Sequence, residues 1–469
     1  MTFAATMAHS APGAPGPRGL ELARALLALR EDPLRAFEHL RARHGSIVRI
    51  ALGARTFYIV ASPAAARHVL CDNARNYGKA TWSYDLLRLV LGRGLLTSEG
   101  AAWRSQRRLL APVFQRSRLP HLAETTLACA DATLERWRAL GDGSVLDLGR
   151  EMAALSLEVL VETTLGVDRG DAGDVTEHLG GILTYIRERT GRPVDFPVNW
   201  PLPHHVRFRR HLRALDAIVR RVIETRRRAP HGGDLVGTLL AARDETGRAL
   251  DDSAVADQVK TFLLAGHETT ANLLTWTLGL LARHPAAAAA VTREVAGSVG
   301  QAPIAAENVR NLAFTRAVLA ESLRLYPPLW LVERRAHEAD TLDGHPVERG
   351  ATIAVSQYLL HRNPEHFPAP ERFEPARFLH DEPAGARARG YLPFGLGSRT
   401  CIGDTSALTQ AAVVIARLAQ AAAGADGRRA LSLALVEREL PPPEAFVTLR
   451  PAEPVRVRVT IQGAGRGRS

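Results

Sequence analysis

Apolar residues at helical spacing recur along most of the chain and predict a mainly helical protein. The longest run spans residues 257–281 and is apolar nearly throughout, which predicts a long helix buried on most sides. Runs at 312–325 and 407–423 predict two more helices. A Tyr-Pro-Pro sequence stops the first of these, and Gly424 ends the second.

Helical patterns also fill most of residues 109–228, with a proline-rich break at 197–203. The leader at 11–17 is rich in proline and glycine and is expected to be irregular. The sequence therefore predicts a mainly α fold with small β-sheets. The predicted β segments are residues 47–50, 56–60, 347–355 and 446–459.

One cysteine lies in a glycine-rich loop shortly before the last predicted helix. Residues 394–403 read FGLGSRTCIG and put Cys401 near a helix N-terminus, where backbone N–H groups favour a thiolate. Such a thiolate serves as a nucleophile or a metal ligand, and a buried structural cysteine is the third interpretation. Cys71 and Cys129 show no zinc-binding spacing, and no histidine lies near Cys401 in sequence. The loop alone leaves these interpretations open.

The loop resembles FGxGxRxCxG, the haem-binding sequence of the cytochrome P-450 family, at every defining position. The resemblance, which runs from about residue 15 to 459, implies the P-450 fold, with haem b (iron protoporphyrin IX) between the long central helix and this loop. It implies that Cys401 is the axial ligand of the haem iron, pushing electron density toward O–O cleavage. It also implies that Arg399 contacts a haem propionate and that Phe394 packs beside the thiolate. Three glycines would let the backbone approach the haem: Gly395, Gly397 and Gly403.

A Glu-x-x-Arg pair, Glu321 and Arg324, lies at the end of the helix predicted at 312–325. In isolation such a pair is usually a solvated i,i+3 contact worth roughly a few tenths of a kcal/mol. In the P-450 family, however, the pair forms a buried triad with an arginine of a later PERF segment, which resembles residues 370–373 here. The resemblance therefore assigns Glu321, Arg324 and Arg372 to a structural triad beneath the haem.

The sequence AGHETT interrupts the apolar helix predicted at 257–281. A threonine there can bond back to the carbonyl four residues earlier and bend the helix, which is a purely structural interpretation. The segment resembles the family's AGxET(T) sequence, where a locally opened helix makes a groove for O₂ and an acid–alcohol pair delivers protons. By resemblance Glu268 and Thr269 are the catalytic pair, and Ala265 and Gly266 line the groove. We expect His267 to lie on the helix face without binding iron.

A tryptophan and two arginines complete the predicted haem contacts. Trp103 and Arg107 are four residues apart, which puts an indole donor and a guanidinium on one helix face. They resemble the family's WxxxR segment, which binds the haem propionates. Arg334 resembles a further propionate contact, although its neighbour Arg335 leaves the register uncertain by one residue.

Length and composition allow a large folded core, because 46% of the 469 residues are apolar. We expect a flexible leader at 1–14, a single haem domain at 15–462 and a disordered tail at 463–469. The three cysteines do not suggest a disulfide framework and fit a reducing cytoplasm. The apolar N-terminal stretch at 20–29 is too short and too charged for a membrane anchor. These features are typical of soluble bacterial members of the family.

The formal net charge is +11, and several arginines cluster near residues 104–118. No nucleic-acid-binding motif accompanies it, so we expect no nucleic-acid partner. No Rossmann or flavin fingerprint is present either, which implies that NAD(P)H-derived electrons come from a separate protein. In the family, basic residues dock small acidic redox proteins. We therefore expect a ferredoxin or flavodoxin with its reductase, and a docking rate that depends on salt.

The resemblance predicts a haem-thiolate monooxygenase that hydroxylates or epoxidises a small apolar substrate with O₂ as co-substrate. Expected pocket segments are mostly apolar, and a terpenoid, fatty acid or polyketide of secondary metabolism is plausible. A peroxide-using or non-oxygenating haem-thiolate enzyme is the alternative, although such enzymes often lack the pair found at Glu268 and Thr269. A non-catalytic haem-binding protein is the third hypothesis.

Overall fold

The computed structural model describes residues 13–461 except 54, 166–171, 191–195, 229–233, 244–248, 380–384, 387–388 and 425–429. The predicted tail and nearly all of the predicted leader lie outside the described residues. The chain divides into two compact units, each described here by itself. Unit 1 comprises Met1–Trp82, Leu331–Pro370 and Pro383–Thr400, and unit 2 comprises Ser83–Trp330, Glu371–Glu382 and Cys401–Ser469.

Unit 1 is built on a five-stranded sheet with the strand order β1-β2-β8-β5-β3. The pair β1–β2 is antiparallel, and β2 pairs with β8 in parallel from Phe57–Thr352 to Val60–Val355. Tyr58, Val60, Ile353 and Val355 are buried in its core. Ala14 is also buried there, so the folded unit begins inside the predicted leader. The elements of unit 1 are α1 (Gly19–Glu31), α2 (Pro33–His44), β1 (Ile47–Leu52), β2 (Arg55–Val60), α3 (Pro63–Arg67), β3 (Tyr77–Gly78), β5 (Val332–Ala336), β6 (Asp340–Leu342), β7 (His345–Val347), β8 (Thr352–Val355) and α15 (Gln357–Leu360).

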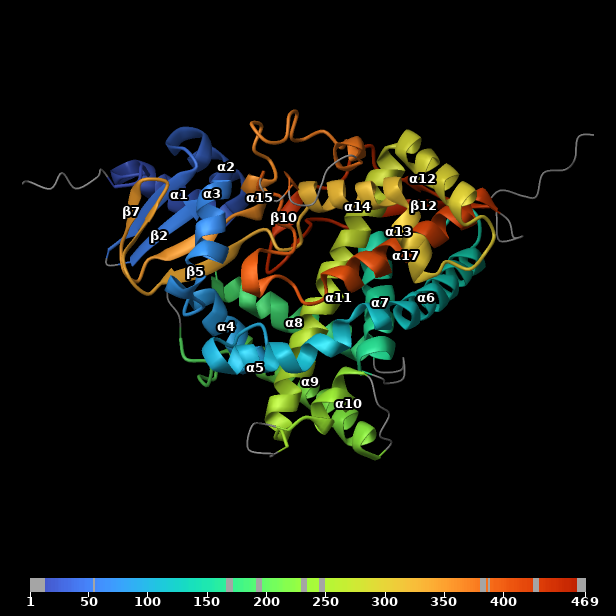
Figure 1. Cartoon of the computed structure of the whole chain (residues 1–469), viewed down its shortest axis with the longest axis horizontal. Helices are drawn as coiled ribbons and strands as arrows, with labels where there is room; N and C mark the ends of the chain where they lie inside the picture. The colour runs from blue at the N-terminus through green and yellow to red at the C-terminus, as the bar shows by residue number, and fades with distance from the viewer. Residues whose placement is uncertain are drawn as a thin grey trace, which may run out of the picture. The chain divides into compact units, whose positions relative to one another are not determined.

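Unit 2 is mainly helical and is organised around α11 (Asp252–Arg283), a helix about 48 Å long at 1.5 Å per residue. In Figure 1 this yellow-green helix runs between its neighbours, and α7 packs along it. The Asp251 carboxylate accepts a hydrogen bond from the Ala254 N–H at 2.7 Å, so the helix begins five residues before the predicted start. The other helices are α4 (Trp82–Leu91), α5 (Gly100–Leu110), α6 (Leu119–Leu140), α7 (Leu148–Leu160), α8 (Ala172–Thr190), α9 (Pro203–Arg228), α10 (Leu235–Ala241), α12 (Pro285–Ser298), α13 (Ala306–Asn311), α14 (Ala313–Leu325) and α17 (Asp404–Ala423).

Two small sheets complete unit 2. One has the order β4-β12-β9, and the other pairs β10 with β11 in an antiparallel hairpin. A mainly α fold with small β-sheets is therefore confirmed. The strands of unit 2 are β4 (Val145–Asp147), β9 (Leu431–Leu435), β10 (Pro443–Ala445), β11 (Leu449–Pro451) and β12 (Arg456–Ile461).

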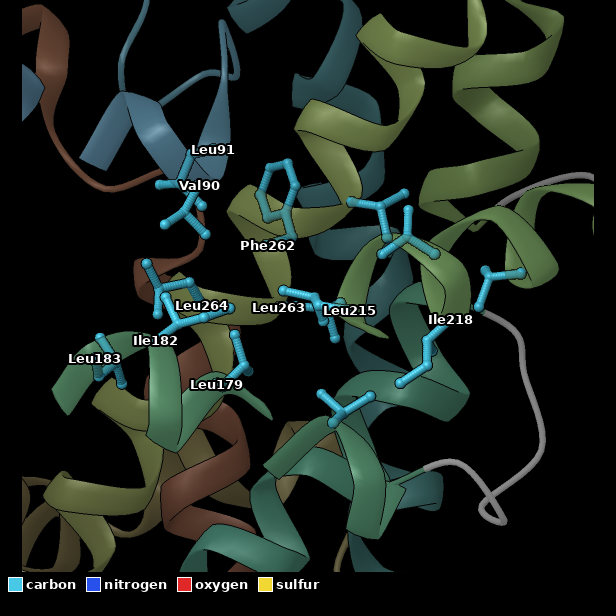
Figure 2. Close-up of a cluster of buried hydrophobic side chains, with 14 of the residues drawn as sticks. Val90, Leu91, Leu179, Ile182, Leu183, Leu215, Ile218, Phe262, Leu263 and Leu264 are labelled. Atoms are coloured by element: carbon cyan, nitrogen blue, oxygen red, sulfur yellow. The ribbon is translucent and has the colours of Figure 1, made fainter. Parts of the chain in front are cut away.

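Apolar side chains from α4, α8, α9 and α11 form one large buried cluster, called here the apolar cluster (Figure 2). Phe262 and Leu264 of α11 belong to it, as do Leu91, Ile182 and Leu215 from the surrounding helices. The N-terminal half of α11 therefore packs against apolar side chains of the surrounding helices.

Among the described helices, α17 alone is long and apolar enough to cross a membrane. Of this stretch 67% is buried inside the fold, as expected of a core helix. Gly424 ends α17 with φ 64°, a left-handed conformation that glycine adopts readily.

Candidate active site

Cys401 lies at the start of α17, two residues before the N-cap Gly403. Its Sγ accepts a hydrogen bond from the Gly403 N–H at 3.4 Å, and the residue keeps solvent-exposed surface. Burial raises the pKa of the Cys401 thiol, while the Gly403 N–H and the charge of Arg107 oppose the rise. The Gly403 N–H thus favours the thiolate, as expected at a helix N-terminus, and burial is the effect that opposes it. A bound metal cation would overcome it, since coordination deprotonates a thiol.

The helix α5 brings Arg107 within electrostatic range of Cys401. Trp103, one turn earlier on the same helix, packs against the apolar cluster and is partly buried. Ile402, the residue after the cysteine, packs against the same cluster. The predicted pair on α5 and the cysteine thus meet one apolar region of unit 2.

The loop before Cys401 belongs to unit 1 as far as Thr400. Two of its glycines differ in what a side chain would meet. Gly397 has φ 74°, and a Cβ on it would lie 2.3 Å from the carbonyl oxygen of Leu70, so only glycine fits. Gly395 has φ 76°, and a Cβ there would meet no atom within 4 Å. Phe394 and Arg399 in this loop are both partly buried.

One face of α11 keeps accessible surface although most of the helix is buried. Ala265 is exposed, and Glu268, Thr269 and Asn272 are partly buried, a spacing of i, i+3, i+4 and i+7 that defines a single stripe. The Thr269 hydroxyl donates to the Ala265 carbonyl at 2.6 Å. The helix α11 runs through this segment without a break in its assignment, and the local opening stays a prediction. The stripe nevertheless brings Glu268 and Thr269 together at an accessible surface.

Burial raises the pKa of Glu268, while a hydrogen bond from Thr448 and the charge of Arg450 oppose the rise. The Asn272 side-chain N–H donates to the Thr448 hydroxyl at 2.9 Å, which leaves the hydroxyl proton for Glu268. The second carboxyl oxygen of Glu268, Oε2, is buried with no hydrogen-bond partner among the described residues. Glu268 is therefore a carboxyl group that burial makes harder to ionise, and its Oε2 has no hydrogen-bond partner among the described residues.

Sequence reasoning missed Thr448, Arg450 and Asn272. The first two belong to the segment around β11, about 180 residues after Glu268. No local pattern predicts that contact. Asn272, one turn after Glu268 on α11, shares its stripe and could have been included on spacing alone.

Two residues of the AGHETT segment face α7 instead. A Cβ on Gly266 would lie 3.0 Å from Leu160, so this glycine permits close packing of α7 against α11. His267 is buried, and a hydrogen bond links it to the backbone of Ala153. Burial lowers the pKa of His267 to about 4, so the ring is neutral at pH 7. The Cβ direction of Gly266 points to α7 while the residue keeps some accessible surface, and its place in a groove stays a prediction.

The Glu321–Arg324 pair is fully buried, and its two hydrogen bonds measure 2.7 and 2.8 Å. The prediction that Arg372 completes the triad is wrong. Its side chain is exposed, and only its carbonyl oxygen takes part, accepting from Arg324 at 3.1 Å. Arg377 supplies the second guanidinium of the triad and lies 3.5 Å from Glu321 and 2.8 Å from Glu374. The short helix at Pro375–Phe378 turns Arg377 toward the carboxylate.

The neighbours Arg334 and Arg335 point to opposite faces of β5, as alternating strand residues do. Arg334 is 7% exposed, and Arg335 lies on the exposed face. Burial therefore favours Arg334 as the inward-facing member of the pair.

The sequence profile of the family described as "Cytochrome P450" matches residues 14–421. The chain is 39% identical over 399 residues to "Cyclooctat-9-en-7-ol 5-monooxygenase" of Streptomyces melanosporofaciens, covering 84% of this chain and 85% of the relative. "Cyclooctatin synthase" of the same organism is 35% identical, over 86% of this chain and 88% of its own length. "Pentalenene oxygenase" of Streptomyces avermitilis is 33% identical, over 82% and 85%.

These matches span most of the chain and include the loop of Cys401, the Glu321–Arg324 pair and the Glu268–Thr269 pair. Each relative is more than 30% identical over more than four fifths of this sequence. The chain therefore belongs to the cytochrome P450 family and is a haem-thiolate monooxygenase.

Proposed function

We propose that this P450 monooxygenase hydroxylates or epoxidises an apolar, terpenoid-class substrate. The accessible stripe of α11 carries the proposal, because it places the polar side chains of Glu268 and Thr269 on the helix that also supplies Phe262 and Leu264 to the apolar cluster. An apolar surface with a few polar groups binds substrates by shape and burial. The names of two relatives denote an unsaturated hydrocarbon and an unsaturated alcohol, which favours the terpenoid among the three predicted classes.

The residues of unit 2 fit a haem-thiolate centre. Cys401 is a free cysteine with exposed surface, and Arg107 is close enough to act on its charge. Ala265 exposes the small side chain that a flat cofactor needs on α11, and Glu268 Oε2 is a buried oxygen without a partner among the described residues. A buried polar atom of this kind is costly unless a ligand or water meets it.

In the proposed assignment Cys401 holds the iron, and Trp103, Arg107, Arg334 and Arg399 bind the propionates. Bound haem supplies O₂ activation and the transfer of one oxygen atom to substrate. Glu268 holds the proton that this chemistry consumes, because burial keeps its carboxyl group protonated to higher pH than usual. Thr269, whose hydroxyl is fixed on the Ala265 carbonyl, sits beside Glu268 and passes protons toward the accessible stripe.

We further propose that electrons come from a ferredoxin or flavodoxin with its NAD(P)H-dependent reductase. Arg104 and Arg108 are exposed on α5, and Arg116 and Arg118 are exposed on the short helix that follows it. Exposed charges of one sign raise the association rate with an acidic partner, and salt screens them. The three free cysteines agree with a cytoplasmic location.

Binding titrations test the substrate class. Cyclic terpenes, fatty acids and polyketide-like compounds are added to the haem-loaded protein, and the spin-state shift of the haem spectrum is followed. We expect the shift with terpenes at micromolar concentration, and oxygenated products once the redox partners are added. A shift with fatty acids alone would refute the terpenoid assignment, and turnover with peroxide alone would favour the peroxide-using alternative.

The partner assignment has its own test. The double variant Arg104→Ala/Arg108→Ala should be reduced more slowly by ferredoxin at low salt and should lose most of the salt dependence. Arg213→Ala on α9 removes an equally exposed charge and serves as the control. Unchanged rates and unchanged salt dependence in the double variant would exclude docking at α5.

A further inference from the structure

Two histidines and a glutamate gather between α8 and α9. Glu177 and His178 come from α8, and His211 comes from α9. The potential ligand atoms of all three lie within 4.8 Å of one another. The two histidine Nδ1 atoms are 3.3 Å apart, and the ring centroids are 5.5 Å apart. Imidazole nitrogens and a carboxylate oxygen are the donors that Zn²⁺ takes in proteins.

A glycine on α8 makes room for the His211 ring. A Cβ on Gly181 would lie 2.5 Å from the His211 Nε2, closer than any side chain allows. Gly180, the preceding residue, faces open space, and a Cβ there would meet no atom within 4 Å. The position of the His211 ring therefore depends on a single missing Cβ, one turn after His178.

The distances fit both a shared proton and a shared metal ion. A tetrahedral Zn²⁺ with bonds of about 2.0–2.1 Å holds two nitrogens about 3.3–3.4 Å apart. The observed 3.3 Å matches that spacing, and it also matches a hydrogen bond between two neutral imidazoles. In the hydrogen bond, one of the two Nδ1 atoms carries the proton. When a metal ion binds both Nδ1 atoms, that proton moves to Nε2 of the same ring, so the two histidines bind the ion without losing a proton.

Two arginines of α9, Arg207 and Arg210, lie close enough to His211 to act on it electrostatically. The carboxylate of Glu177 supplies the negative charge that a divalent cation needs among these arginines.

We propose that Glu177, His178 and His211 form a binding site for Zn²⁺ or a similar divalent transition metal that links α8 to α9. Three protein ligands leave the fourth tetrahedral position for water. Because the ligands come from two helices, the bound ion acts as a cross-link between them and stabilises their packing. None of the three ligands is a member of the apolar cluster or one of the predicted haem contacts.

The experiment is a calorimetric titration of ZnCl₂ into the haem-loaded, tag-free full chain, together with thermal unfolding with and without the metal. Variants His178→Ala and His211→Ala remove one ligand each. His121→Ala is the control, because His121 is exposed on α6 outside the cluster. Gly181→Ala displaces the His211 ring without removing a ligand, and Gly180→Ala is its matched control.

We expect one Zn²⁺ per chain and a higher unfolding temperature with metal for the native sequence, His121→Ala and Gly180→Ala. Either histidine variant should lose the site, and Gly181→Ala should weaken binding by about tenfold or more, the scale seen when a ligand is misoriented. No saturable Zn²⁺ binding by the native chain would overturn the proposal. Equal affinity in Gly181→Ala and Gly180→Ala, with unchanged binding in the histidine variants, would overturn it as well.

Discussion

The corrected triad makes a quantitative prediction about three arginines. Glu321 receives two hydrogen bonds from Arg324 and one from the Glu374 N–H at 2.9 Å, and Arg377 lies 3.5 Å away. Removing Arg377 leaves the carboxylate with three hydrogen bonds, two from Arg324 and one from Glu374. We therefore expect Arg377→Ala to lower the free energy of unfolding by about 1–3 kcal/mol, the range for one interaction with a charged group.

The other two variants bracket that value. Arg324→Ala strands a fully buried carboxylate and should cost about 3–5 kcal/mol. Arg372→Ala removes an exposed side chain while keeping the carbonyl that Arg324 uses, so its effect should stay within about 0.5 kcal/mol. The order of destabilisation is thus Arg372, Arg377 and Arg324, from least to most.

Thermal unfolding of the haem-loaded variants measures this order. An unfolding entropy of about 2 cal/mol/K per residue gives about 1 kcal/mol/K for 469 residues, so 2 kcal/mol lowers Tm by about 2 °C. Circular dichroism resolves such a difference when the variants are compared side by side. A Tm for Arg372→Ala as low as that of Arg377→Ala would refute the assignment of Arg377 to the triad.

Two further predictions concern the chemistry and the loop. Thr448→Val removes the hydroxyl whose hydrogen bond lowers the pKa of Glu268, so the pKa of this carboxyl should rise. The protonated form of Glu268 delivers the proton, so activity in Thr448→Val should be lost only at a higher pH than in the native sequence. Thr448→Ser keeps a hydroxyl and should restore the original pH profile. An unchanged pH profile in Thr448→Val would contradict the role of Thr448. Gly397→Ala should abolish haem loading, since its Cβ would lie 2.3 Å from the Leu70 carbonyl oxygen. In Gly395→Ala the Cβ faces open space, so this variant should load haem and lose only about 1–2 kcal/mol of folding stability because of the positive φ. Equal haem content in these two variants, measured by the ratio of haem to protein absorbance, would speak against the steric argument.

Local sequence patterns predicted the central parts of the fold well. The apolar run at 257–281 lies within α11, and the run at 312–325 matches α14 to one residue. The break at 197–203 lies between α8 and α9. Such elements are predictable because their period and their stop signals are encoded within a few turns.

Strand continuity was less predictable. The single strand expected at 347–355 is two strands, β7 and β8, because Gly350 between them has φ 81°. The segment at 446–459 likewise contains β11 and β12 separately. Turn geometry of this kind interrupts a β-rich stretch without changing its composition.

The site shows the same limit at the level of side chains. The motif residues Cys401, Glu268 and Thr269 could be named from the sequence. The arginine of the triad could not, because two similar segments, PERF at 370–373 and PARF at 375–378, both end in Arg-Phe. Only the structure shows which guanidinium turns inward. The Thr448 contact with Glu268 joins residues far apart in the chain, which no local pattern encodes.

The CO difference spectrum of the dithionite-reduced protein tests the central claim most directly, measured beside a Cys401→Ser variant. Thiolate ligation of the haem iron predicts a strongly red-shifted Soret band in the native sequence and its loss in the variant. A band typical of histidine-ligated haem, or the same red-shifted band in both proteins, would contradict the assignment of Cys401 as the iron ligand.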